Sequence, residues 1–221
     1  MNPLIAPADA PPAPVAVPYP PDLPAGLSPR SRVLLLIDAD AVSHGLVDDK
    51  PQSRASYREM RTCLDLVDAT ARSIDPRTRV RCAASTATAT HHLDVMTESG
   101  GNTWLVRRGL HGADQAVLEE LNYLLQVRLA DQRPGRTGRA GDAFMVLLVA
   151  QDHIYSRAVR QLRLLGVPTW LLVPGLYVAA NLYSAACAVT FIGPRPGLSI
   201  SGPGISPRPG SPGARLSGRK S

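Results

Sequence analysis

Three aspartates, far apart in the chain, occupy positions that would bring their side chains together in a folded α/β protein. Asp38 and Asp152 each follow a run of apolar residues, and Asp114 lies in the first turn of a predicted helix. Clustered carboxylates repel one another and stay ionised only around a cation. Oxygen ligands suit Mg²⁺ or Mn²⁺, and such an ion can polarise a phosphoryl oxygen and activate water. Asp38, Asp114 and Asp152 are therefore candidate catalytic and metal-binding residues.

Two further acids stand near these three in the sequence. Asp40 follows Asp38 by two residues, and Glu120 lies six residues after Asp114. Both are candidate additional metal ligands. For Asp38 and Asp152 the alternative is a structural role, because an aspartate after a strand also caps the next segment by bonding to backbone amides. For Asp114 the alternative is stabilisation by the helix dipole, which favours an acid in the first turn of a helix without any function.

The elements that would position these acids alternate along the chain. Apolar runs predict strands at 33–37, 79–84, 103–107, 144–150, 167–173 and 188–192. Helical spacing of apolar residues predicts helices at 53–74 (with Ser53 as its cap), 86–98, 113–130, 154–165 and 178–185. After His44 and Gly45, a polar loop through Asp48, Asp49 and Pro51 is expected before the first helix. Alternating strands and helices imply right-handed crossovers and a parallel sheet.

We therefore predict an α/β fold, a Rossmann-like three-layer αβα domain with a mainly parallel sheet of five to six strands. Ligands of such sheets lie at the carboxyl ends of the strands. The first and fourth strands are often central neighbours, so Asp38 and Asp152 are expected side by side, with Asp114 at the same edge. No Gly-x-Gly-x-x-Gly follows the first strand and no Gly-Lys-Ser/Thr phosphate loop occurs. Dinucleotide binding and P-loop functions are therefore not expected.

These motifs, in this order, resemble the NYN domain, a branch of the PIN-like nuclease fold, over residues 32–192. The family's first strand ends in Asp-Gly-x-Asn, where this chain has Asp38-Ala39-Asp40-Ala41. Its Lys-Gly-x-Asp step opens a helix with a second acid six residues on, where this chain has His111-Gly112-Ala113-Asp114 and then Glu120. Its Ser-Gly-Asp-Ser-Asp-Phe motif corresponds to Ala150-Gln151-Asp152-His153-Ile154-Tyr155, followed by a helix that ends in Leu165-Gly166.

The resemblance implies a ribonuclease that depends on Mg²⁺ or Mn²⁺ and takes RNA as its partner. Two family positions differ in this chain, because Ala41 replaces the asparagine and Ile154 replaces the second aspartate of the last motif. The late acid expected near the last strand is also absent, since residues 186–189 carry none. These losses favour a second hypothesis, a catalytically inactive NYN-like module that binds RNA or a protein partner.

Basic residues near the acids are candidates for contact with RNA. His44, His111 and His153 stand beside the proposed acids, where they suit phosphate contact or general acid work. The candidate RNA-binding set is Arg107, Arg108, His111, Arg133, Arg136, Arg139 and His153. Solvated surface side chains are the alternative explanation of the histidines and of the arginines.

A third function comes from the first motif alone. The run Asp38-Ala39-Asp40-Ala41-Val42 resembles the start of haloacid dehalogenase-like phosphohydrolases. That resemblance implies Asp38 as the phosphorylated nucleophile and Asp40 as the general acid. The family also needs a lysine late in the domain, and the sequence has none between Pro51 and Arg219. This function therefore ranks last.

Composition divides the chain of 221 residues into three parts. Residues 1–30 are rich in Pro and Ala, and residues 194–221 in Pro, Gly, Ser and Arg. Both are expected to be disordered, because they cannot bury enough apolar surface to offset chain entropy. The net charge is +6, of which the tail contributes +5 and the first thirty residues −1, so +2 remains for the domain at 31–193. The basic tail would add sequence-independent attraction to a polyanion.

The remaining features concern environment and assembly. Cys63, Cys82 and Cys187 stand among apolar residues, which predicts free thiols in a reducing compartment and a cytoplasmic location. The uncharged stretch 164–194 is long enough for a membrane span, but Pro168 and Pro174 break it, which favours strand–helix–strand over membrane insertion. The sequence leaves open whether the chain forms a homodimer.

Overall fold

The computed structural model describes residues 32–47, 53–99, 102–131 and 144–192. They form a parallel sheet of six strands in the order β3-β2-β1-β4-β5-β6. The strands are β1 (Arg32–Asp38), β2 (Arg79–Ser85), β3 (Thr103–Arg107), β4 (Phe144–Val149), β5 (Thr169–Pro174) and β6 (Ala188–Ile192). The predicted α/β class and parallel sheet are confirmed. The two segments that were predicted to be disordered, 1–30 and 194–221, lie outside the described residues.

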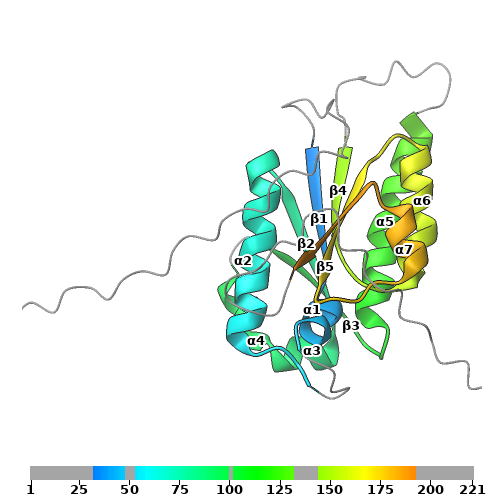
Figure 1. The fold of residues 1–221 in the computed structure, drawn as a ribbon. Coiled ribbons are helices and arrows are strands. Elements are labelled where there is room, and N and C mark those ends of the chain that lie inside the picture. The colour runs from blue at the N-terminus through cyan, green and yellow to red at the C-terminus, as the bar shows by residue number, and fades with distance from the viewer. Residues whose placement is uncertain (1–31, 48–52, 100–101, 132–143, 193–221) are drawn as a thin grey trace, which may run out of the picture.

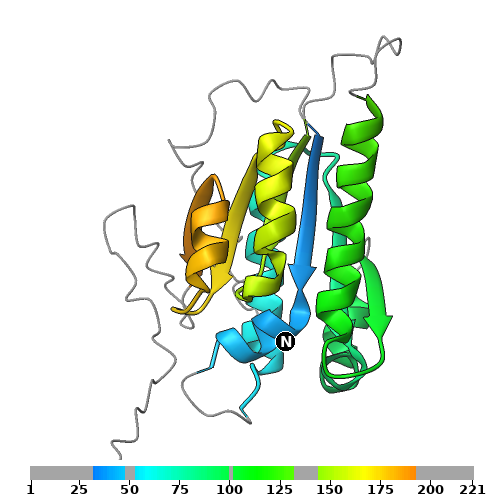
Figure 2. The same ribbon diagram turned by 90° about the vertical axis from the view of Figure 1, so that its right-hand side faces the viewer.

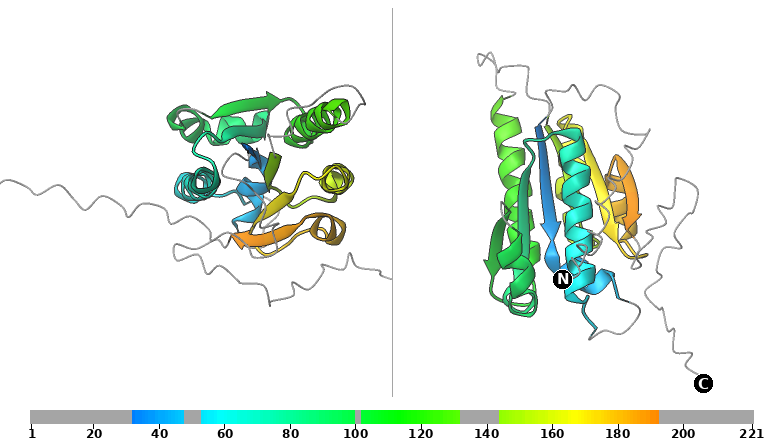
Figure 3. Two further views of the ribbon diagram at one scale, coloured as in Figure 1. Left: turned by 90° about the horizontal axis from the view of Figure 1, so that it is seen from above. Right: turned by 90° about the vertical axis from the view of Figure 1, so that its left-hand side faces the viewer.

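Helices flank the sheet on both faces (Figure 1). They are α1 (Ala39–Gly45), α2 (Tyr57–Ile74), α3 (Thr86–His91), α4 (Leu93–Glu98), α5 (Gly112–Asp131), α6 (Ser156–Leu164) and α7 (Ala180–Ala185), with a 3₁₀ turn η1 (His153–Tyr155) before α6. The helix α2 lies against one face, whereas α5, α6 and α7 cover the other (Figures 2 and 3). This arrangement is the predicted three-layer αβα domain.

The sheet has a hydrophobic core on each face, because side chains along each strand point alternately to the two sides. On β1, Leu35 and Ile37 join the core beneath α2, whereas Leu34 and Leu36 join the core beneath α5 and α6. A strand that is buried on both faces must be apolar at every position, because its side chains point alternately to the two sides. The continuous apolar runs in the sequence therefore predicted the central strands well.

Three local features differ from the prediction. The residues after β1 form the short helix α1, which was not predicted, and Asp38 is its N-cap. The predicted polar loop through Asp48, Asp49 and Pro51 lies outside the described residues. The cap of α2 is Ser56, not Ser53, because Ser56 and Glu59 form a reciprocal capping box. The predicted helix 86–98 is two short helices that meet at His92, whose side chain is buried.

The long uncharged stretch of the sequence folds as β5, α7 and β6. Within the described ranges, no helix combines the length and the apolar character that a membrane span requires. The thiols of Cys63 and Cys82 are free and buried, as predicted, and that of Cys187 is free and half-buried. Burial raises the pKa of the Cys63 and Cys82 thiols to about 12, so both stay protonated near neutral pH.

Candidate active site

The candidate active site is a cleft at the carboxyl edge of the sheet. The strands β1 and β4 are hydrogen-bonded neighbours, and the chain leaves them in opposite directions across the sheet. Such a reversal opens a crevice beyond the strand ends, which is where ligands bind in open α/β folds. A cleft of about 790 Å³ lies there. Its charged or titratable lining residues are Asp38, Asp40, His44, Arg54, Asp114 and Asp152.

Asp38 is fixed at the end of β1 by two contacts. Its Oδ1 accepts a hydrogen bond from the backbone amide of Ala41 at 3.0 Å, which caps α1. Its Oδ2 lies 2.8 Å from the hydroxyl of Tyr155. The side chain is 2% exposed, and this burial raises the pKa of Asp38 to about 7, partly offset by the bonds from Ala41 and Tyr155. The predicted capping role is therefore confirmed, and Asp38 also lines the cleft.

Tyr155 connects two of the three predicted acids. Its hydroxyl lies 2.8 Å from Asp38 Oδ2 and 2.8 Å from Asp114 Oδ1. A phenol has one proton, so it donates to one carboxylate at a time. The second contact is a hydrogen bond only when that carboxyl group carries a proton, and the raised pKa of Asp38 allows this near neutral pH. The two acids and the phenol therefore form one hydrogen-bonded group that shares protons.

The start of α5 places Asp114 against this pair. Gly112 opens the helix so close to the end of β3 that an added Cβ would lie 2.5 Å from the carbonyl oxygen of Arg107. This close approach requires glycine, and it brings Asp114 to the edge where β1 ends. The other oxygen of Asp114, Oδ2, lies 3.1 Å from His111 Nδ1.

Asp152 and Asp40 line the same cleft from other sides. Asp152 follows β4, its side chain is 45% exposed, and its Oδ1 contacts His153 Nδ1 at 2.5 Å. Asp40 lies in the first turn of α1 and accepts a hydrogen bond from the amide of Ser85 at 3.0 Å. The structure therefore brings Asp38, Asp40, Asp114 and Asp152 to one cleft from the ends of β1 and β4 and the starts of α1 and α5.

Glu120 does not reach this cleft. Its Oε1 pairs with the guanidinium of Arg81 at 2.6 Å, and it lines a different pocket, toward the opposite edge of the sheet. Six helical residues turn the side chain through about 240° relative to Asp114, so the two face different directions. The predicted contribution of Glu120 to an acidic cluster is therefore not seen in this conformation.

Some of the candidate RNA-binding residues lie at the cleft, and others do not. The side chains of His111 and His153 are 79% and 68% exposed and contact Asp114 and Asp152 at the cleft. Arg107 is exposed and pairs with Glu119, and Arg108 is exposed beside it at the end of β3. Three of the predicted arginines, Arg133, Arg136 and Arg139, lie outside the described residues.

Two residues near these acids had no predicted role. Arg54 lines the cleft and donates from Nη1 to the carbonyl oxygen of Ala87 at 2.9 Å, so the cleft also carries a permanent positive charge. Tyr155 is fully buried and bridges two acids. The sequence shows only that an aromatic residue follows Asp152 by three positions, and it does not show where the hydroxyl points.

The carboxylates of the cleft are suitable ligands for a divalent ion, but only two of them converge on one point. Four carboxylates supply the oxygen ligands that Mg²⁺ or Mn²⁺ prefers. Two of them, on Asp38 and Asp114, converge on one point, the hydroxyl of Tyr155. In the part of the chain that the structure describes, no three His, Cys, Asp or Glu side chains are arranged to hold one metal ion. The conformation therefore offers a two-carboxylate site, with Asp152 on the wall of the same cleft.

Comparisons with known proteins give no independent identification. No protein-family model matches the chain. No curated protein is similar enough to match it either.

Proposed function

We propose that this protein hydrolyses phosphodiester bonds in RNA at the carboxyl-edge cleft, with a Mg²⁺ or Mn²⁺ ion held by Asp38 and Asp114. The convergence of these two carboxyl groups on the hydroxyl of Tyr155, each at 2.8 Å, is the observation that carries the proposal. Two acids are kept this close only when something between them offsets their repulsion. In the metal-free protein, protons on the phenol and on Asp38 serve that purpose.

The roles of the chain's own residues follow from their positions. Asp38 and Asp114 would hold the ion as carboxylates, so Asp38, whose pKa is raised to about 7, would have to be deprotonated. Once bound, the ion would polarise the phosphodiester and activate water. Arg54 and His44 line the cleft and suit contact with the substrate's phosphates. Asp152, whose side chain is 45% exposed, would orient water in the same cleft.

We infer from the same residues that the chain is NYN-like. The resemblance rests on three motifs whose acids, Asp38, Asp114 and Asp152, line one cleft. Convergence of separate motifs on one site supports the family proposal more than any one motif does, because short motifs occur by chance. RNA as the substrate class rests on this resemblance.

Cleavage of a labelled single-stranded RNA in Mn²⁺ tests the proposal. The wild-type chain is expected to produce fragments that disappear in excess chelator. Asp114→Asn is expected to reduce the rate by about a hundredfold or more, because one of two ligands is lost. Glu120→Gln is the matched control, since Glu120 lies in another pocket, and it should keep wild-type activity. Equal loss in both variants would contradict the assigned site.

A second candidate function is RNA binding without turnover. It is favoured by the absence of a three-ligand metal group in the described residues. The same assay separates the two functions. Retention of the labelled RNA by the wild-type chain without fragments, with or without Mn²⁺, would support the binding module and contradict hydrolysis.

A further inference from the structure

Three arginines lie on the exposed side of α6, outside the carboxyl-edge cleft. Arg157, Arg160 and Arg163 are all exposed and follow one another at intervals of three residues. Each is turned by about 60° around the helix axis from the one before it, so one side of α6 presents all three. Figure 2 shows α6, in yellow, between α7, in orange, and α5, in green. The proposed hydrolysis assigns no role to these arginines.

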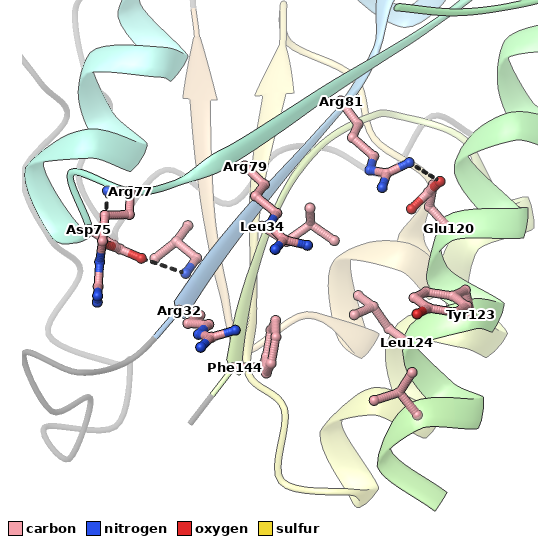
Figure 4. A pocket seen from close by; sticks show the side chains of 12 residues that line it. Arg32, Leu34, Asp75, Arg77, Arg79, Arg81, Glu120, Tyr123, Leu124 and Phe144 are labelled. Carbon is pink, nitrogen blue, oxygen red and sulfur yellow. Dashed lines mark hydrogen bonds and ion pairs between the residues drawn. The ribbon is translucent and has the colours of Figure 1, made fainter. Parts of the chain in front are cut away.

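No carboxylate among the described residues neutralises these arginines. Their side chains form neither an ion pair nor a hydrogen bond with another residue that the structure describes. Within α6 there is no acid, and residues 164–192, which include α7, contain no charged side chain. The acids of the neighbouring helix α5, none of which pairs with α6, are Asp114, Glu119, Glu120 and Asp131. Glu120, for instance, pairs with Arg81 on β2 (Figure 4). The guanidinium groups of α6 are therefore available to an anionic ligand.

A groove opens beside the first of these arginines, between α5 and α6. It has a volume of about 280 Å³ and is lined by Leu118, Asn122, Ile154, Arg157, Ala158 and Gln161. The amides of Asn122 and Gln161 both donate and accept hydrogen bonds, as the edge of a nucleobase does. The volume is smaller than that of most small-molecule pockets, which suits one unpaired base and not a larger ligand.

The chain connects this surface directly to the cleft. Asp152 of the cleft is followed by the turn η1 and then by α6, so the first of the arginines, Arg157, comes soon after Asp152. From there α6 runs back toward the amino edge of the sheet, and the other two arginines lie progressively farther from the cleft (Figure 1). The cleft itself is lined by the carboxylates of four aspartates and by one arginine, so it repels the phosphates of a strand that continues beyond it. A basic surface beside the cleft offsets this repulsion.

We propose that the α6 surface, formed by Arg157, Arg160, Arg163 and the groove beside Arg157, binds the single-stranded RNA that flanks the cleaved bond. The guanidinium groups contact the phosphates, and their spacing along the helix lets them follow the backbone away from the cleft. The groove takes one base of the strand. RNA is favoured over an acidic protein segment because the amides of the groove match a base edge, whereas carboxylates need only the arginines. This inference rests on the proposed hydrolysis for the position of the cleaved bond, and it adds where the rest of the strand lies.

Fluorescence anisotropy of a labelled single-stranded RNA of about twelve nucleotides, titrated with the full chain in chelator, tests this inference in the absence of cleavage. The triple variant with Arg157→Gln, Arg160→Gln and Arg163→Gln is expected to bind the RNA at least about tenfold more weakly at low salt, because three charge-assisted contacts are lost. The slope of log K against log salt concentration should become shallower by about 2, since each phosphate contact on a single strand contributes about 0.7.

A second triple variant removes the same charge from another part of the molecule. Arg58, Arg72 and Arg77, which are exposed on α2 and just after it, are replaced by Gln, and α2 lies on the opposite face of the sheet from α6. Its affinity for RNA and its salt slope are expected to stay close to those of the wild type. Thermal unfolding checks that both triple variants are folded.

A single variant tests the groove. Asn122→Ala is expected to weaken RNA binding severalfold and to leave the salt slope unchanged, because it removes a hydrogen-bonding group and no charge. Asn102→Ala, just before β3 at the far edge of the sheet, is the matched control and should leave the affinity unchanged. Equal effects of the two substitutions would contradict the role of the groove.

The outcomes separate this inference from the proposed hydrolysis. Equal weakening by the two triple variants, or no RNA binding by the folded wild type, would overturn the inference, whereas hydrolysis is judged by the cleavage assay with Asp114→Asn. Binding that depends on the α6 arginines, without fragments in Mn²⁺, would support RNA binding by this surface and contradict hydrolysis. Competition by polyglutamate as effective as that by unlabelled RNA at equal charge would assign the surface to an acidic protein segment and overturn the inference.

Discussion

The hydroxyl of Tyr155 lies between the carboxyl groups of Asp38 and Asp114 and reduces the repulsion between them. Its ring is fully buried, and its hydroxyl lies 2.8 Å from an oxygen of each acid. Burial and the two neighbouring acids raise the pKa of the Tyr155 phenol well above its usual value, so the proton stays on the oxygen. A neutral donor between two acids lowers their mutual repulsion without occupying more than one oxygen of each. Tyr155 is therefore a positioning residue for both.

Tyr155→Phe is expected to destabilise the metal-free protein by about 2 kcal/mol, because buried polar groups lose a hydrogen-bond partner while the ring remains. Urea unfolding in chelator measures this difference. Tyr123→Phe is the matched control, since its ring is 65% exposed, and it should change stability by less than about 0.5 kcal/mol. Equal stability of the two variants would show that the bridge contributes nothing to the fold.

The positions of individual site residues could be predicted from the sequence where a residue lies at the end of a strand. Asp38 and Asp152 follow adjacent parallel strands, so the rule for sheet edges was enough to place both at one cleft. Contacts between side chains distant in sequence could not be predicted in this way. Tyr155 and Asp38 are 117 positions apart, and nothing in either local sequence specifies that they meet.

At the scale of elements, caps determine where helices begin. Ser56 accepts from the amide of Glu59, and a carboxylate oxygen of Glu59 accepts from the amide of Ser56 at 2.7 Å. This reciprocal pair satisfies two amides that a helix start leaves without partners. The resulting helix, α2, packs Met60, Leu64 and Val67 against the sheet and thereby fixes β1 beneath it.

Ser56→Ala is expected to lower the free energy of unfolding by about 1 kcal/mol, through loss of the side-chain half of the capping box. Ser53→Ala should leave it within about 0.5 kcal/mol, since Ser53 lies before the helix. Thermal and urea unfolding of the two variants would measure both values. A larger effect at Ser53 than at Ser56 would mean that the helix begins earlier than the structure shows.

Element prediction depended on the length of the pattern. The strands at 103–107 and 188–192 have the predicted bounds, because each is a short apolar run between clear breaks. The helix α1 has only seven residues, too few for helical periodicity to show, and its apolar residues are only Ala39, Ala41 and Val42. The division between α3 and α4 was also unpredicted, because His92 is buried there by a contact with Ser43 from α1.

At the scale of the whole molecule, His92 links global stability to pH. Its Nε2 lies 3.0 Å from the hydroxyl of Ser43, and burial lowers the pKa of His92 from 6.5 to about 4, aided by nearby positive groups on His91, Arg54 and His44. As pH falls below 6.5, the unfolded chain takes up this proton and the folded chain does not until about pH 4. The contribution of His92 to stability is therefore intact above pH 6.5 and decreases between pH 6.5 and 4.

Asp38, whose pKa burial raises to about 7, stabilises the fold as the pH falls over the same range, so the effect of His92 is tested as a difference between two chains. Between pH 7 and pH 4.5 the urea midpoint of the wild type is expected to show a loss relative to that of His92→Gln. The difference between the two slopes isolates His92 from the carboxylates that also titrate in acid. His153→Gln, an exposed histidine, should retain the wild-type slope. Identical slopes for the wild type and His92→Gln would show that protonation of His92 does not drive the loss.

The most direct test of the central claim is unfolding of the full chain with and without Mn²⁺, for the wild type and Asp38→Asn. A ligand that binds only the folded state stabilises it by about 2.7 kcal/mol at a hundred times its dissociation constant. The wild type is expected to show this saturable gain, and Asp38→Asn is expected to show none while being at least as stable without metal, because it removes a buried acid. No gain for the folded wild type, or an equal gain in Asp38→Asn, would contradict a divalent-ion site formed by Asp38 and Asp114.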